Sequence, residues 1–253
     1  MPYHVTMMTR REIRSHNPAE PCHVKVTVIV PAYNEAATLE AILERLESRD
    51  DVDEVLVVDD GSTDGTSAIV LRFTERDTRF RLLRHPTNLG KGAAVRTALA
   101  QATGDVFIIQ DADLEYDPVD FPKLLSPIRQ GKADVVYGSR IRGRNPMSYL
   151  SFFLGGVTLS ILTDLLYAAR ITDEPTCYKA FRREALSRIE LRANGFEFCP
   201  ELTAKLLLSG RRIHEVAISY VPRTKDQGKK IRWTDGLKAV WTLFFLRLTG
   251  KVR

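Results

Sequence analysis

The fold is decided by a stretch near the middle of the chain, which reads VFIIQDADLEYDP at residues 106–118. It opens with a continuous apolar run, the pattern of a strand buried on both faces of a parallel sheet. Acidic residues follow directly where this strand ends, at Asp111, Asp113 and Glu115. Three further runs have the same apolar pattern, at 26–30, 55–60 and 134–138. The four runs together predict parallel strands that each end in a polar loop.

The segments between these runs carry apolar residues at helical spacing, at 36–48, 64–76 and 91–103. Strands that alternate with such helices predict an α/β fold with a doubly wound, mostly parallel sheet and helices on both faces. Further along we expect a helix from about residue 195, a strand over 214–220 and a final helix. Ligands of such sheets bind beyond the carboxyl ends of the strands, so functional residues are expected in those loops.

The composition indicates one α/β domain with a basic surface. A chain of 253 residues that is 44% hydrophobic can build one sizeable core but hardly two. A formal net charge of +5 favours a phosphate-bearing or membrane-surface partner, with an ordinary solvated surface as the alternative. Nucleic acid is a poor fit, because the basic residues cluster on loops near acids.

The three cysteines, Cys22, Cys177 and Cys199, lack metal-ligand spacing. Their odd number argues against a disulfide framework, so a reducing cytoplasm is expected.

Two segments differ from the predicted sheet in composition. Residues 1–23 are polar and lack the apolar centre of a secretory signal, so we expect a tail there and one folded domain over 24–233. The uncharged stretch 145–163 approaches the length of a membrane span, but Ser, Thr and Gly dilute its hydrophobicity. We therefore expect a helix that lies at a membrane surface or packs on the domain.

The last predicted helix, over 234–253, is amphipathic and basic. Its expected apolar face consists of Leu237, Val240, Trp241, Phe244 and Leu248. Basic residues surround that face, at Lys238, Arg247, Lys251 and Arg253. This composition is typical of a helix at a membrane interface, and packing against the sheet is the alternative.

The acidic loop after residue 110 predicts a metal site. Asp111 and Asp113 are separated by one residue at the end of an apolar strand, where they repel each other unless a cation lies between them. Hard oxygen ligands suit Mg²⁺ or Mn²⁺, which usually keep water and substrate phosphate oxygens as their other ligands. Glu115 could complete the protein's share. The alternative is a solvated acidic turn.

Three other loops carry polar residues where a strand ends or a helix begins. The loop PAYNEA at 31–36 opens a helix with an acid in its first turn. The adjacent acids Asp59 and Asp60 are costly at a strand end unless they bind hydrogen-bond donors, for which a base or a ribose is a candidate. Lys91 lies between two glycines where backbone amides can approach an anion, although a simple turn explains this pattern equally well. The spacing matches neither a Walker loop nor a dinucleotide fingerprint.

Two basic loops complete the candidate site. The first follows the strand at 134–138 and carries Arg140, Arg142 and Arg144. The second precedes the final helix and carries Arg223, Lys225, Lys229, Lys230 and Arg232. Guanidinium groups are planar multi-donor cations, so arginines near an acidic metal site favour phosphate binding. For the second loop a phosphate clamp at a membrane is the hypothesis, and a solvated run of charges is the alternative.

The motifs PAYNEA, VVDDGSTDGT, NLGKGAA, DADLEYDP and YGSR occur in this order. In that combination the sequence resembles family 2 glycosyltransferases of the GT-A fold, over about residues 24 to 250. Within the family it is most similar to the dolichol-phosphate mannose synthase and polyprenyl-phosphate glycosyltransferase group. Many members of that group carry obvious transmembrane helices at the C-terminus. This sequence differs from them, because its last residues show no such helices. The resemblance does not name the donor sugar.

The resemblance implies roles for individual residues. The nucleotide-sugar site is expected to include Pro31, Tyr33, Glu35, Asp60, Lys91, Asp111 and Ala112. Mg²⁺ or Mn²⁺ is expected on Asp111 and Asp113, with Glu115 where relatives place another oxygen ligand. The acceptor phosphate is expected to contact Arg140, Arg144, Arg223 and Lys229. Asp113, Arg140 and Arg223 are the expected catalytic residues.

The implied reaction is an inverting transfer, in which an acceptor oxygen attacks the anomeric carbon of a GDP- or UDP-sugar and the nucleoside diphosphate leaves. A polyprenyl or dolichyl phosphate acceptor is already ionised and requires no strong base. A hydroxyl of a soluble or glycan acceptor would require one, with Glu197, Glu201 or Asp173 as candidates. A nucleotide-binding protein without turnover is the alternative of another class. We expect a peripheral protein at the cytoplasmic face of a membrane, of undetermined oligomeric state.

Overall fold

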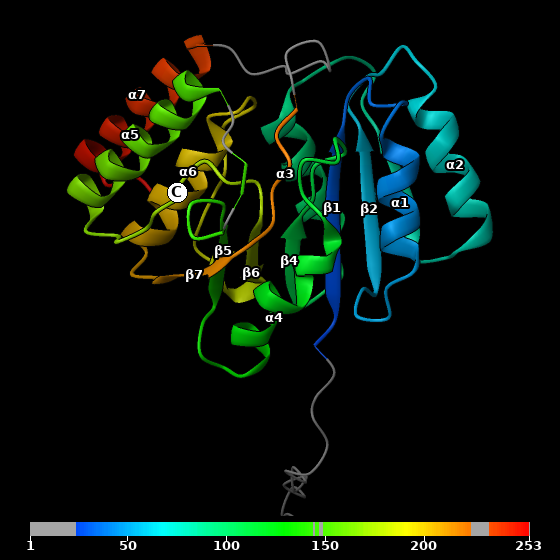
Figure 1. Cartoon of the computed structure of the whole chain (residues 1–253), viewed down its shortest axis with the longest axis horizontal. Coiled ribbons are helices and arrows are strands. Elements are labelled where there is room, and N and C mark those ends of the chain that lie inside the picture. The colour runs from blue at the N-terminus through cyan, green and yellow to red at the C-terminus, as the bar shows by residue number, and fades with distance from the viewer. Residues whose placement is uncertain (1–23, 144, 147–148, 224–232, 253) are drawn as a thin grey trace, which may run out of the picture.

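The computed structural model describes residues 24–143, 145–146, 149–223 and 233–252. Within these residues seven strands form one sheet, in the order β3-β2-β1-β4-β6-β5-β7 (Figure 1). The strands are β1 (Val26–Ala32), β2 (Glu54–Asp59), β3 (Phe80–Arg84), β4 (Val106–Ile109), β5 (Val135–Ser139), β6 (Lys179–Arg182) and β7 (Ile213–Ala217). β6 pairs antiparallel with β4 and β5, and the other pairs are parallel. The predicted fold class, a mostly parallel α/β sheet, is confirmed.

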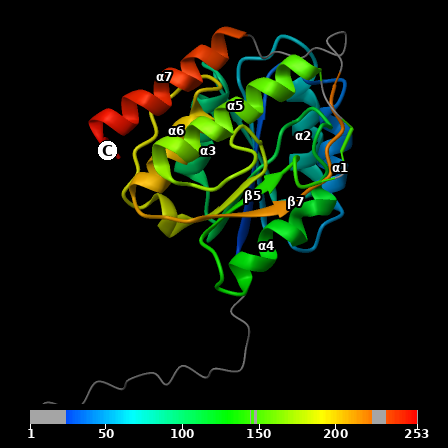
Figure 2. The same cartoon turned by 60° about the vertical axis from the view of Figure 1, so that its left-hand side comes forward.

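The helices lie on both sides of this sheet (Figures 1 and 2). Their bounds are α1 (Leu39–Glu47), α2 (Thr66–Arg76), α3 (Lys91–Gln101), α4 (Phe121–Arg129), α5 (Leu150–Tyr167), α6 (Phe198–Leu208) and α7 (Trp233–Thr249). Two short 3-10 helices cover Pro118–Asp120 and Arg183–Leu186. The first three helices lie within the ranges that apolar periodicity predicts. The sequence patterns did not predict α4, β3 or β6.

The inner strands are apolar because both of their faces are covered. All six residues of β2 and all four of β4 are buried, as are six of the seven residues of β1. β3 lies at an edge of the sheet and is only half-buried, which explains why its charged residues, Arg81 and Arg84, hide the strand pattern. β6 is short and carries Lys179, a fully buried cation whose Nζ donates to the carbonyl of Glu174 at 2.6 Å.

Helices α5 and α7 lie side by side and both contact α6 (Figure 2). A second, smaller apolar cluster joins them, made of Leu159, Ala204, Ala239, Leu243 and Leu246. Residues 150–163 of the uncharged stretch expected over 145–163 thus form most of α5. Within the described residues, no helix combines the length and the apolar composition that a membrane crossing needs.

The apolar face expected for the final helix is largely the face that α7 exposes. Leu237, Trp241, Phe244 and Leu248 are exposed, and Val240 is half-buried. The buried side of α7 is formed instead by the residues of the small cluster, and it packs on α6 and α5. The helix therefore has two apolar sides. One side packs on α5 and α6, and the other is exposed.

Candidate active site

The acidic loop after β4 is held by a buried glutamine. The side-chain amide of Gln110 donates to the carbonyl of Asp111 at 2.9 Å and accepts from the hydroxyl of Tyr178 at 2.6 Å. Leu114 has a φ of 63°, in the left-handed region that non-glycine residues rarely adopt. Through this turn the carboxylate of Asp113 accepts the backbone N–H of Glu115 at 3.1 Å. Gln110 was not predicted from the sequence, although it belongs to the quoted stretch.

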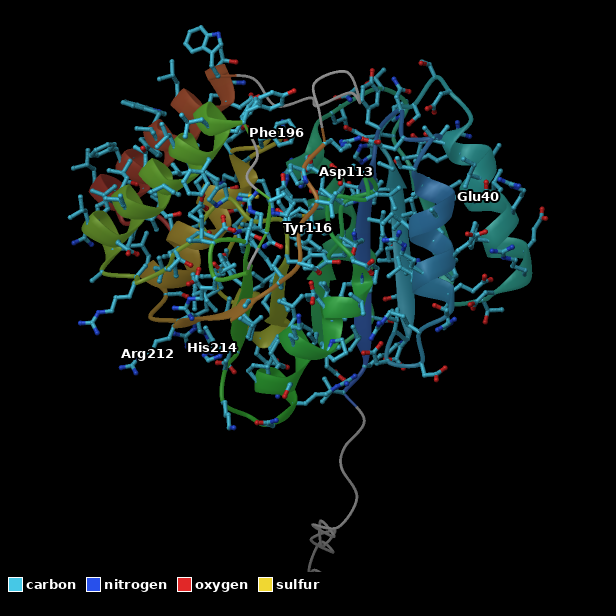
Figure 3. All side chains as sticks on the ribbon, viewed as in Figure 1. Glu40, Asp113, Tyr116, Phe196, Arg212 and His214 are labelled. Atoms are coloured by element: carbon cyan, nitrogen blue, oxygen red, sulfur yellow. The ribbon has the colours of Figure 1, made fainter. Side chains whose placement is uncertain are left out.

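Two cationic side chains lie on the two predicted metal ligands. Lys91 Nζ lies 2.6 Å from Asp111 Oδ1, and Arg223 Nη2 lies 2.8 Å from Asp113 Oδ2. Arg223 also pairs with Glu35, with 3.1 Å between Nη1 and Oε2. The repulsion expected between the acids is therefore relieved by positive charge from the protein itself. Asp113 and the neighbouring Tyr116 lie in the middle of the molecule, between the α5–α7 group and β1 (Figure 3).

The electrostatics of the pair favour an added cation. Burial raises the pKa of Asp113 to about 7, with further increases from Asp111 and Glu115, against the opposing effect of Arg223. Burial alone would lower the pKa of Lys91, but its neighbours, Asp111 first among them, together raise the pKa and hold the lysine charged. Part of the rise in the pKa of Asp113 comes from the negative charges of Asp111 and Glu115, which a cation bound beside them would offset.

The carboxylate of Glu115 points to other partners. It accepts the hydroxyl of Tyr220 at 3.0 Å and the backbone N–H of Arg223 at 2.8 Å. Among the described residues, no three His, Cys, Asp or Glu side chains are grouped so that they could hold a metal ion. The expected three-carboxylate set is therefore not assembled in this conformation. Asp111 and Asp113 remain, and Mg²⁺ commonly takes one or two protein carboxylates beside phosphate and water.

Asp60 holds the loop that carries Lys91. Its carboxylate accepts the backbone N–H of Leu89 at 2.9 Å and of Gly90 at 2.7 Å, and lies 2.6 Å from Nδ1 of His85. The expected contact of Asp60 with a base or ribose would have to share a carboxylate that is already buried and hydrogen-bonded. Sequence reasoning missed His85, whose other ring nitrogen lies 2.9 Å from the hydroxyl of Thr97. The neighbouring Asp59 accepts the N–H of Ser62 at 2.8 Å.

The loop after β1 is tied to the acidic loop. The hydroxyl of Thr38 donates to the carbonyl of Ala112 at 2.7 Å and lies 3.2 Å from Glu35 Oε2. Pro31, Tyr33 and Glu35 are half-buried, whereas Ala112 is buried. Pro31 lies at the carboxyl end of β1 and Tyr33 and Glu35 follow it, and β1 runs parallel to β4, the strand that leads into Asp111. The structure therefore brings these expected nucleotide-site residues to the same edge as Asp111 and Asp113.

Arg140 reaches the same region from β5 and is linked to the acidic loop by an aromatic residue. Its guanidinium carbon lies 5.1 Å from the ring centre of Tyr220, whose hydroxyl binds Glu115. Tyr220 and Tyr178 flank Tyr116, with ring centres 5.3 and 4.8 Å from it. Two of the arginines predicted to bind phosphate are thus connected to the acidic loop, Arg140 through Tyr220 and Arg223 through its ion pair with Asp113. Arg144, Lys225, Lys229, Lys230 and Arg232 lie outside the described residues.

Two of the three candidate bases already have strong partners. Asp173 binds Arg140 with 2.6 Å between Oδ1 and Nη2. Glu201 accepts the backbone N–H of Arg192 and lies 2.9 Å from Lys205 Nζ. Glu197 differs, since one of its oxygens accepts the N–H of Gly195 at 3.0 Å while Oε2 has no hydrogen-bond partner within the described residues. Of the three, Glu197 is the one whose carboxylate retains an oxygen without a hydrogen bond among the described residues.

Comparison with known proteins shows the family of the chain. Residues 27–190 match the model of the family described as glycosyl transferase family 2. The chain is 29% identical to the UDP-N-acetylglucosamine–dolichyl-phosphate N-acetylglucosaminyltransferase of Methanococcus voltae, over 90% of this chain and 97% of that one. It is 32% identical to the undecaprenyl-phosphate mannosyltransferase of Micrococcus luteus, over 81% and 87%. It is 31% identical to the dolichyl-phosphate beta-glucosyltransferase ALG5D of Trichomonas vaginalis, over 85% and 70%.

Solved structures share the fold. The glucosyl-3-phosphoglycerate synthase of Mycobacterium tuberculosis, in complex with Mn²⁺, uridine diphosphate and phosphoglyceric acid, superposes with a TM-score of 0.67 at 22% identity. The match covers 88% of this chain and 78% of that one. The same enzyme is also known with Mg²⁺ and uridine diphosphate. At this level of identity the likeness shows the GT-A fold.

Proposed function

Because the chain belongs to glycosyl transferase family 2 and is a glycosyltransferase, we propose that it transfers a sugar, with inversion, from a GDP- or UDP-sugar to the phosphate of a polyprenyl or dolichyl lipid. The names of its relatives give the acceptor class. One observation in this chain supports the proposal most strongly. Two cations suited to a phosphate acceptor are joined to the acidic loop that suits a donor's cation: Arg223 pairs with Asp113, and Arg140 lies against Tyr220, whose hydroxyl binds Glu115. This arrangement can hold two anions next to each other.

At the donor side, Asp111 and Asp113 are the residues that would hold Mg²⁺ or Mn²⁺. The ion would supply a Lewis acid for the negative charge that grows on the leaving diphosphate. Lys91 contributes a second positive charge at the same place, since its ammonium group already lies 2.6 Å from Asp111. The end of β1 and the loop after it, with Pro31, Tyr33 and Glu35, form the proposed surface for the nucleoside.

At the acceptor side, the reaction needs an ionised oxygen held near the anomeric carbon. A lipid phosphate brings that oxygen, so orientation by Arg140 and Arg223 replaces proton removal. The engagement of Asp173 and Glu201 in strong ion pairs supports this choice, because neither carboxylate is available as a base. A hydroxyl acceptor remains the second candidate, and the buried oxygen of Glu197 is the observation that favours it.

A membrane surface is the proposed location. The outward sides of α5 and α7 expose large apolar side chains at Leu150, Leu154, Ile161, Leu165, Trp233, Leu237, Trp241, Phe244, Phe245 and Leu248. Exposed basic residues accompany them on α7 and after it, at Lys238, Arg247 and Lys251. Apolar and aromatic residues beside basic ones suit the headgroup region of an anionic bilayer. The free thiols of Cys177 and Cys199 support the cytoplasmic side.

The test is a transfer assay with UDP- and GDP-sugars, with and without a short polyprenyl phosphate, and with Mg²⁺, Mn²⁺ or neither. We expect metal-dependent product only with the lipid phosphate. Arg140→Ala should lower transfer by about 100-fold or more while leaving nucleotide affinity unchanged, since Arg140 acts on the acceptor. Asp113→Ala should abolish the metal dependence together with the activity.

Other outcomes separate the alternatives. Product with hydroxyl acceptors but not with polyprenyl phosphate, abolished by Glu197→Gln, would replace the lipid-phosphate proposal with the hydroxyl one. Tight nucleotide binding without turnover for every donor and acceptor would contradict both.

A further inference from the structure

The guanidinium of Arg140 is held on one edge by a single carboxylate. Asp173 Oδ2 accepts from Nε at 2.8 Å and Oδ1 accepts from Nη2 at 2.6 Å, which is the bidentate geometry of a strong ion pair. The same Oδ2 also accepts the backbone N–H of Arg140 at 2.8 Å. Asp173 therefore fixes both the main chain and the side chain of this arginine. Its side chain is only 3% exposed, so the pair is shielded from water on the Asp173 side.

Asp173 is in turn held by a second buried acid, Glu215 on β7. Oε1 of Glu215 accepts the backbone N–H of Thr172 at 2.8 Å and of Asp173 at 3.0 Å. Oε2 accepts the hydroxyl of Thr172 at 2.9 Å and lies 3.3 Å from Nε of Arg142. Glu215 lies on β7, and Arg140 directly follows β5. Because β7 pairs with β5, the sheet holds both residues in place.

We propose that Asp173 and Glu215 are positioning residues for the acceptor phosphate, acting through Arg140. The inference rests on the proposed function and extends it. With Nε and one N–H of Nη2 bound to Asp173, the guanidinium presents its opposite edge, which includes Nη1. That edge has the paired donors that two oxygens of a phosphate can accept. The ring of Tyr220 lies along the guanidinium and links it to Glu115 on the acidic loop.

This role is distinct from that of a base. Both oxygens of the Asp173 carboxylate are engaged by donors of Arg140, so neither is directed at an acceptor hydroxyl. Fixing the arginine before the acceptor binds removes the entropy cost of ordering a long side chain in the complex. A guanidinium misplaced by about 1 Å would lower the rate by roughly 100-fold.

The first test is a double-mutant cycle on kcat/KM for a polyprenyl phosphate at saturating donor. Asp173→Asn should lower this value about 100-fold, mainly by raising the acceptor KM, and should leave the donor KM unchanged. Glu215→Gln should have a smaller effect in the same direction. Because both residues act through Arg140, the double variant of Asp173→Asn and Arg140→Ala should be no slower than Arg140→Ala alone. Losses that multiply would overturn the proposal.

The matched control is Glu174→Gln, a buried acid next in sequence to Asp173. Its carboxylate accepts from the hydroxyl of Thr203 and not from Arg140. It should leave the acceptor KM at the wild-type value. An equal rise in acceptor KM for Glu174→Gln and Asp173→Asn would show that any disturbance of this loop is sufficient, and would overturn the assignment.

A second readout needs no substrate. The Nε–H of Arg140 should give a separate, slowly exchanging NMR signal, identified by its absence in Arg140→Lys. That signal should be lost in Asp173→Asn while the rest of the spectrum keeps its dispersion. If it is unchanged, Asp173 does not hold the arginine and the proposal fails. If wild-type protein transfers no sugar to polyprenyl phosphate but the signal depends on Asp173, the clamp on Arg140 exists and the proposed function is what fails.

Discussion

Arg223 lies on Asp113, with 2.8 Å between Nη2 and Oδ2, and so places a protein cation on a carboxylate predicted to bind a metal. The same arginine pairs with Glu35 on the loop after β1. Its side chain is only 15% exposed, and Asp113 and Glu35 raise its pKa against the effect of burial. A divalent ion bound at Asp113 would repel this arginine. Metal binding at Asp113 would therefore compete with the Arg223 contact for one carboxylate.

From this competition we expect Arg223→Gln to bind Mn²⁺ more tightly than wild type in the absence of nucleotide. The gain should be about tenfold, since a charge-assisted hydrogen bond contributes about 1.5 kcal/mol. Electron paramagnetic resonance of free Mn²⁺ during titration measures it directly. Arg45→Gln is the control, because Arg45 pairs with Asp117 at 2.9 Å on the exposed surface and should leave Mn²⁺ affinity unchanged. Equal or weaker Mn²⁺ binding by Arg223→Gln would show that the two cations do not compete.

A second prediction concerns the turn that carries Lys91. Gly90 has a φ of +101°, and a Cβ added there would lie 2.4 Å from the carbonyl oxygen of Asn194. Gly90→Ala should therefore destabilise the protein by several kcal/mol and displace Lys91 from Asp111. Gly131→Ala is the control that separates backbone strain from a steric clash. Gly131 also has a positive φ, +69°, but an added Cβ there meets nothing within 4 Å. That control should cost only about 1–2 kcal/mol.

Urea unfolding and donor KM decide this prediction. Gly90→Ala should raise the donor KM, whereas Gly131→Ala should not. If both variants lose the same stability and keep the same donor KM, the close approach of Gly90 to Asn194 has no role in holding the lysine.

The sheet and its loops could be predicted from the sequence because their signals are local. A buried parallel strand is written as a continuous apolar run, and the acids that follow it mark its carboxyl end. What could not be predicted are the pairings between distant residues. Arg140 and Asp173 are separated by 33 positions, and Arg223 and Asp113 by 110. No periodicity in a single sequence encodes such a pair. For this reason the sequence presents Asp173 as a candidate base, whereas in the structure it is the partner of Arg140.

Asp60 illustrates the same limit at closer range. Two adjacent acids at a strand end predict that something donates hydrogen bonds to them, and this expectation holds. The donors are the backbone of residues 89 and 90 and the ring of His85, which fold back onto the strand end. A sequence pattern can indicate that a buried carboxylate needs donors, but the identity of the donors depends on how the loop closes.

The exposed side of α7 gives a third prediction. Trp241 is 69% exposed and lies among apolar neighbours on the outward face. Burying such a side chain in a bilayer contributes about 1.5–3 kcal/mol, so Trp241→Ser should weaken binding to vesicles of phosphatidylglycerol and phosphatidylcholine by roughly tenfold or more. Leu71→Ser is the control, since Leu71 is 48% exposed on α2. Co-sedimentation at low and high salt measures both the apolar and the charge contributions.

Two results would count against the membrane proposal. One is wild-type protein that stays in the supernatant with anionic vesicles at low salt. The other is equal loss of vesicle binding in Trp241→Ser and Leu71→Ser, which would mean that the α7 surface has no special part in it.

The last prediction concerns pH and the buried Glu174. Oε1 of this residue accepts from Thr203 at 3.0 Å, while Oε2 has no hydrogen-bond partner within the described residues. Burial raises the pKa of Glu174, and the charge of Lys179 offsets this only in part. A carboxyl group whose pKa is higher in the folded than in the unfolded protein stabilises the fold when protonated, and that contribution is lost as the pH rises through the folded-state value.

Glutamine resembles the protonated form at every pH. In urea titrations, the free energy of unfolding of Glu174→Gln minus that of wild type should therefore increase as the pH rises above 4.5, the ordinary pKa of a glutamate. Glu40→Gln, at an exposed position on α1, should show no such trend. A difference that is flat or falls with pH would mean that the charged form of Glu174 is as well accommodated in the fold as in water.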